Sequence, residues 1–195
     1  MELVPFISLK DGKIHTGTTM DLITIDNVFN RVNKDTMLYV LDFDGITNNN
    51  SNVDLYQKLA DHCILWIDSG PRRIDDVMDT IMAGATSITV RTDLWPDVNI
   101  PDIVEITDND IYLALTPDHL EQPRTILRSY ENLGAVVFSE DKHFEHVLTS
   151  AYMLSEPMLK HKIYLYSGSP QNASYWSQRG VTGLLVDLQI KEGDK

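Results

Sequence analysis

The chain has 195 residues, of which 43% are hydrophobic and 23% charged, a balance typical of one globular domain with a well-buried core. Its formal net charge of −13 excludes a broad nucleic-acid surface but leaves room for a local anion site. Cys63 is the only cysteine, which excludes a disulfide framework and a thiolate metal cluster. Because the first residues lack a signal-peptide pattern and no apolar run reaches membrane-spanning length, we expect a cytoplasmic protein without membrane contact.

Eight short apolar runs follow one another along the chain. Each is rich in Val, Ile, Leu and Tyr and is apolar on both faces, which is typical of parallel strands buried on both sides. The runs cover residues 3–9, 37–43, 63–67, 87–90, 111–115, 135–138, 163–166 and 183–186.

Helical patterns lie between several of these runs, at residues 74–85, 117–135, 142–157 and 172–181. The alternation predicts an α/β fold, and eight strands favour a single (β/α)8 barrel, a TIM barrel, over residues 1–195. A doubly wound open sheet is the alternative.

The chain is short for such a barrel, since about 200 residues is the lower end of the usual range. Part of the helical layer must therefore be reduced. The interval after the fourth run contains Pro96 and Pro101 and has no helical stripe, so we expect irregular chain in place of the fourth helix. The nine residues from Asp187 to Lys195 leave room for at most one turn of an eighth helix.

Three stretches resemble one family in order and spacing. They are "VPFISLKDGKIH" (residues 4–15), "LYVLDFDGITNNN" (38–50) and "LWIDSGPRRIDDVMDTIMAGATSITVRTDL" (65–94). They are similar to the ProFAR isomerases, the HisA-like barrels of histidine biosynthesis. The resemblance implies a barrel that binds a phosphorylated sugar or ribotide, a small anionic metabolite, without a cofactor or a resident metal; it leaves the oligomeric state open.

The stretch from Asp42 to Gly45, "DFDG", has a second resemblance. It is similar to the nucleophile loop of haloacid-dehalogenase-type phosphatases, in which Asp42 would attack a phosphate. Ile46 departs from that pattern, and no lysine lies between Lys58 and Lys142 to complete such a site. The Asn-rich run at 47–52 is interpreted as a flexible loop at the barrel mouth.

The resemblance also implies two catalytic aspartates, at the ends of the first and fifth strands. Ser8 and Thr116 occupy these positions. A hydroxyl cannot replace a carboxylate as general base without an activating partner, so authentic isomerase activity is not expected. An enzyme would need its acid and base elsewhere, at Asp42, Asp118 or Asp141; the alternative is a non-catalytic barrel that binds a metabolite.

Polar residues at the carboxyl ends of the strands are the candidate ligand-binding groups. We expect the turn at residues 167–169 to cradle an anion with the help of Arg91. The alternative is that Arg91 pairs with Asp68 or Asp42 and fills the mouth. The full set of candidates is Ser8, Asp68, Arg91, Thr92, Thr116, Ser139, Ser167, Gly168, Ser169 and Asp187.

Overall fold

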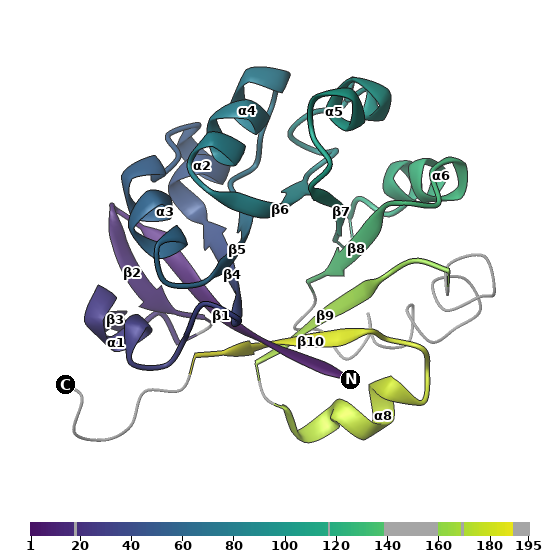
Figure 1. The fold of residues 1–195 in the computed structure, drawn as a ribbon. Helices are drawn as coiled ribbons and strands as arrows, with labels where there is room; N and C mark the ends of the chain where they lie inside the picture. Colours follow the sequence, from purple (N-terminus) through teal and green to yellow (C-terminus); the bar gives the residue numbers. More distant parts are fainter. Residues whose placement is uncertain (18, 117, 139–159, 169, 189–195) are drawn as a thin grey trace.

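The computed structural model describes residues 1–17, 19–116, 118–138, 160–168 and 170–188. Eight parallel strands form a closed barrel, because β10 pairs with β1 as well as with β9 (Figure 1). The predicted barrel is therefore confirmed, and the open-sheet alternative is wrong. The strands are β1 (Glu2–Lys10), β4 (Met37–Asp42), β5 (Ile64–Asp68), β6 (Ala85–Val90), β7 (Asp110–Leu115), β8 (Gly134–Val137), β9 (Ile163–Gly168) and β10 (Gly183–Asp187).

An antiparallel hairpin extends the wall beyond β1. Strands β2 (Lys13–Thr16) and β3 (Leu22–Ile23) follow a tight turn at Asp11 and Gly12, which have φ values of 52° and 68°. Glycine adopts this left-handed conformation without steric cost, which explains its place in the turn. The sequence gives this hairpin little apolar signal, and it was not expected.

Helices surround the barrel on its outer side (Figure 1). Seven-residue α5 lies where irregular chain was expected after the fourth strand, so the fourth helix is short rather than missing. Pro101 stands in its first turn, where the absent N–H breaks no helical bond. Residues 189–195 of the interval expected to hold an eighth helix, and the pattern at 142–157, lie outside the described residues. The helices are α1 (Ile25–Phe29), α2 (Phe43–Asn48), α3 (Val53–Ala60), α4 (Ile74–Met82), α5 (Ile100–Ile106), α6 (Glu121–Ser129), the 3-10 turn η1 (Pro170–Asn172) and α8 (Ala173–Ser177).

Alternate residues of each strand build two separate cores. The outer one lies between the strands and the helices, and the inner one fills the barrel with large rings. Trp66 stands at the centre of the inner core, with ring centroids 3.9 Å from Tyr112, 4.8 Å from Tyr164 and 4.9 Å from Tyr39. Among the described residues, no helix is long and apolar enough to cross a membrane.

Two strands begin with glycine where these rings approach the barrel wall. A Cβ on Gly134 would lie 2.3 Å from Tyr112, and one on Gly183 would lie 2.7 Å from Tyr164. Contacts this short are not tolerated, so these glycines make room for the aromatic filling. The inner core is therefore a packed interior and not a channel.

Replacing Trp66 by alanine should lower the free energy of unfolding by about 3–5 kcal/mol, because a fully buried ring is replaced by a cavity. Chemical denaturation followed by circular dichroism measures the change. Met82→Ala is the control, since that side chain is 78% exposed and its loss should cost less than about 0.5 kcal/mol. Equal effects of the two substitutions would contradict a close-packed barrel interior.

Candidate functional site

The carboxyl ends of the strands define the barrel mouth, and strand alternation decides which side chains face it. Inner-core residues such as Trp66 and Tyr166 fix the parity in their strands. Asp42 follows inward-facing Leu41 and therefore points to the helix layer. The inward-facing residues at or just beyond the strand ends are Ser8, Asp68, Arg91, Thr116, Phe138 and Asp187.

A buried ion pair joins the ends of β5 and β6. Arg91 donates from Nε to Asp68 Oδ1 over 2.9 Å and from Nη2 to Asp68 Oδ2 over 2.7 Å. The Asp68 side chain is fully buried, and that of Arg91 is 11% exposed. Such a bidentate pair is the strong form of a charge-assisted hydrogen bond. Of the two expectations for Arg91, the structure shows the pairing with Asp68.

A chain of hydrogen bonds supports this pair from inside the barrel. Tyr39 donates to Asp68 Oδ2 over 2.8 Å, and its oxygen lies 3.3 Å from Thr89 Oγ1. Trp66 donates from Nε1 to the same Thr89 oxygen over 2.9 Å. All of these side chains are buried, so the barrel contains a polar network and not only apolar rings.

Burial and neighbouring charge fix the protonation states of Tyr39 and Arg91. Burial raises the pKa of Tyr39, and the negative charge of Asp68 raises it further, so the phenol stays protonated and remains a donor. Burial alone would lower the pKa of Arg91, but the Asp68 carboxylate outweighs it and the pKa is raised. The guanidinium therefore stays charged inside the mouth.

Aromatic rings cover the floor of the mouth beside Arg91. The guanidinium carbon lies 5.4 Å from the ring centroid of Phe138, close enough for a cation–π contact. Phe138 in turn lies 6.0 Å from Tyr166, whose hydroxyl donates to Asp187 Oδ1 over 3.1 Å. Asp187 is thus hydrogen-bonded to Tyr166, and the rings of Phe138 and Tyr166 lie between it and Arg91.

The hairpin covers the mouth on the side of β1 and β10. Ser8 is fully buried and donates from Oγ to the carbonyl of Gly17 over 3.3 Å. Gly17 packs so closely against Asp187 and Phe6 that a side chain there would clash with both. Ser8 is therefore engaged by the chain itself, which corrects the expectation that it offers a ligand-binding hydroxyl at an open mouth.

The remaining candidates on the described strand ends have no hydrogen bond to the Asp68–Arg91 pair among the described contacts. Thr92 is buried at 2% exposure. Thr116 is partly buried and bridges to His119, and Asp118 is exposed on the same turn. Ser167 and Gly168 are the last residues of β9. Ser139, Asp141 and Ser169 lie outside the described residues.

Asp42 is a structural residue of the helix layer. Its carboxylate accepts from the backbone N–H groups of Asp44 (3.0 Å), Gly45 (3.1 Å) and Asn52 (2.7 Å). It also accepts from Asn52 Nδ2 over 2.9 Å and from the Tyr56 hydroxyl. With no exposed surface and these five donors, Asp42 does not line the mouth as predicted. The carboxylate that the phosphatase resemblance implies as nucleophile thus lies in a buried cluster of a closed barrel.

Asp44 ties the β1–β2 hairpin to α2. It accepts from the backbone N–H groups of Asp11 and Gly12, each over 2.9 Å, and from Asn52 Nδ2 over 2.9 Å. Burial alone would raise the pKa of Asp44, but the bonds from Asn52, Gly12 and Asp11 outweigh it and lower the pKa. The Asn-rich run is therefore held in a defined conformation, contrary to the predicted flexible loop.

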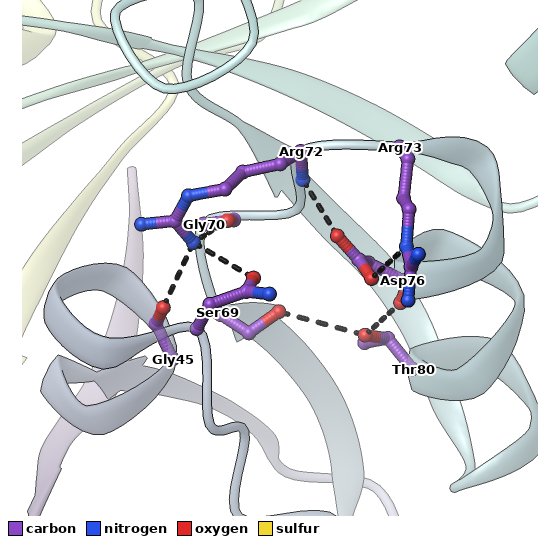
Figure 2. Close-up of polar contacts among 8 residues, drawn as sticks. Gly45, Ser69, Gly70, Arg72, Arg73, Asp76 and Thr80 are labelled. Carbon is purple, nitrogen blue, oxygen red and sulfur yellow. Dashed lines mark hydrogen bonds and ion pairs between the residues drawn. The ribbon is translucent and has the colours of Figure 1, made fainter.

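The loop after β5 is filled by its own side chains (Figure 2). Arg72 donates to the carbonyls of Gly45 (3.1 Å) and Gly70 (3.2 Å) and, from Nη2, to that of Ile46 (2.7 Å). Asp76 accepts from the backbone N–H of Arg72 over 2.9 Å, at the start of α4. A cation thus binds the end of α2, and a carboxylate occupies the helix terminus where an anion would bind.

The described part of the chain offers no arrangement of side chains that supports a metal site. Among the described residues, no group of three or more His, Cys, Asp or Glu is arranged to hold a metal ion. Asp42 and Asp68 point to opposite sides of the barrel wall, so their carboxylates cannot share a cation.

Sequence reasoning missed the residues that organise the site. Tyr39, Trp66 and Thr89 lie within the predicted apolar strands, and Asn52 lies within the predicted loop, so the pattern marks none of them as a polar site residue. One signal in the sequence could have indicated the network. Trp66 and Asp68 are two residues apart in one strand, so the indole and the carboxylate lie on the same face of it.

No protein-family model matches this chain, and no curated protein matches it either. The resemblance to the ProFAR isomerases consequently rests on the three motifs alone, and the structure adds the barrel fold. Fold alone does not determine function, because this barrel hosts many different chemistries.

The lowered pKa of Asp44 predicts how stability depends on pH. An unfolded aspartate has a pKa of about 3.9, so the stability from ionised Asp44 is complete above about pH 4 and is lost as the pH falls through the lower folded value. Urea unfolding should show Asp44→Asn less stable than the wild type near neutral pH, with a difference that narrows in acid. Asp97→Asn, at an exposed position, is the control and should show no such narrowing.

Proposed function

We propose that this chain is a divergent relative of the ProFAR isomerases that binds a small anionic metabolite, a phosphorylated sugar or ribotide-like molecule, at the barrel mouth. In this proposal it does not carry out the family's isomerisation. The observation that carries the proposal is the charged guanidinium of Arg91, held at the mouth by Asp68 and flanked by the ring of Phe138.

The geometry of Arg91 supports anion binding through the side of its guanidinium that does not contact Asp68. Asp68 engages Nε and Nη2, so Nη1 is the guanidinium nitrogen that the ion pair does not use. A carboxylate that fixes an arginine reduces the entropy lost when the arginine binds a ligand, although it also offsets part of the positive charge. We therefore expect weak binding of a single phosphate group.

The residues at the two ancestral catalytic positions support the absence of isomerisation. Ser8 is buried beneath Gly17, and Thr116 is a partly buried hydroxyl at the end of β7. Neither position has a carboxylate, and Asp42 is saturated with hydrogen bonds in another layer. Of the acid and base candidates for a relocated chemistry, Asp118 is exposed on the rim and Asp141 lies outside the described residues.

Titration with inorganic phosphate tests the binding proposal. The wild type should bind in the millimolar range, and removal of the cation should abolish binding, because the charge-assisted hydrogen bond is lost. Since Arg91→Ala alone would leave Asp68 buried without its partner, Asp68→Asn/Arg91→Met removes both charges together. Arg73→Ala is the control, because it removes a cation that is 68% exposed beside α4. Absence of binding by the folded wild type would refute the proposal.

Complementation tests the loss of isomerase chemistry. Expression of this chain should not restore growth without histidine to a strain that lacks ProFAR isomerase, because no carboxylate stands at position 8 or 116. An authentic isomerase gene serves as the positive control. Robust growth would show that the acid and base have been relocated within this barrel.

A further inference from the structure

The buried network has a fixed direction of hydrogen bonding. An indole N–H can only donate and a carboxylate can only accept. The two ends of this series of hydrogen bonds therefore determine the direction in which the two hydroxyls between them donate. Trp66 donates to Thr89 over 2.9 Å, which directs the Thr89 proton to the Tyr39 oxygen at 3.3 Å. Tyr39 then donates to Asp68 over 2.8 Å. Every donor in the chain points toward the carboxylate.

We propose that Tyr39 is a positioning residue for the mouth: through this one-way chain it holds Asp68 in place, and Asp68 in turn fixes the guanidinium of Arg91. Asp68 has no exposed surface and accepts from Tyr39 and twice from Arg91. Oδ2 is shared between Tyr39 and Arg91 Nη2, so the phenol sets the rotation of the carboxylate against which Arg91 aligns. For ligand binding this inference rests on the function proposed above; for the geometry of Arg91 it stands alone.

Neighbouring aromatic rings hold the ring of Tyr39 independently of its hydroxyl. Its ring is fixed by Trp66 at 4.9 Å, Phe6 at 5.8 Å and Phe138 at 5.9 Å between ring centroids. The same ring therefore contacts the core below and Phe138 at the mouth above. Removal of the hydroxyl alone leaves this packing in place and isolates the hydrogen bond to Asp68.

Tyr39→Phe is the direct test, and Tyr112→Phe is its matched control. Tyr112 is also a buried tyrosine that packs on Trp66, but its hydroxyl lies 3.5 Å from Asp110, at the start of β7 and the opposite end of the barrel. Thermal unfolding of both variants establishes that each one folds. Because each variant loses one buried tyrosine hydroxyl, any difference between them in the properties of Arg91 comes from where the lost hydroxyl lies.

Nuclear magnetic resonance of ¹⁵N-labelled protein gives the first readout. The Arg91 Nε–H signal should be protected from solvent exchange in the wild type and in Tyr112→Phe, and it should exchange faster in Tyr39→Phe. The Trp66 indole N–H signal should also shift in Tyr39→Phe, because Thr89 loses the acceptor of its proton. An unchanged Arg91 signal in folded Tyr39→Phe would overturn the inference, whether or not any ligand binds.

Phosphate titration gives the second readout. Tyr39→Phe should bind about tenfold more weakly than the wild type, and Tyr112→Phe should bind like the wild type. Equal affinities of all three proteins would overturn the positioning role. If the wild type binds no phosphate, the proposed function fails, and the exchange of the Arg91 signal still decides whether Tyr39 positions the ion pair.

Discussion

The carboxylate of Asp68 is the constraint on which the mouth of this barrel depends. A charge without exposed surface is costly to hold in a protein interior unless it is paired and fully hydrogen-bonded. Arg91 supplies the opposite charge, and Tyr39 supplies the further donor. Both partners come from neighbouring strands. The parallel register places Tyr39 opposite Trp66, two residues before Asp68, so the phenol reaches the carboxylate from inside the barrel. The site and the barrel wall therefore specify each other.

The two aspartates of the "DFDG" stretch show a different use of the same side chain. Asp42 and Asp44 are satisfied by backbone N–H groups and by Asn52, and they join the hairpin, α2 and α3 into one unit. Arg72 completes the unit by binding the carbonyls at the end of α2. In this part of the molecule, charged groups stabilise the loops at the carboxyl ends of the strands.

The barrel could be predicted from the sequence because strands buried on both sides produce continuous apolar runs, and all eight were visible. The hairpin and α2 could not, because their stability comes from long-range hydrogen bonds of Asp44 and Asn52 and not from a local apolar pattern. The sequence left Asp68 and Asp42 open as carboxylate partners of Arg91, because the choice between them depends on which side of its strand each aspartate faces. Asp42 was misplaced for the same reason: one residue of register moves a side chain from the mouth to the helix layer.

The closure of the barrel places the first residues of the chain in the wall itself. Glu2 pairs with Gly183, and its carboxylate accepts from Tyr164 at the end of the barrel where the parallel strands begin. Met1, 44% exposed, lies just outside that end. A label, a surface or a fusion partner attached ahead of Met1 would therefore leave the molecule on the side away from Arg91, and the mouth would face free solution.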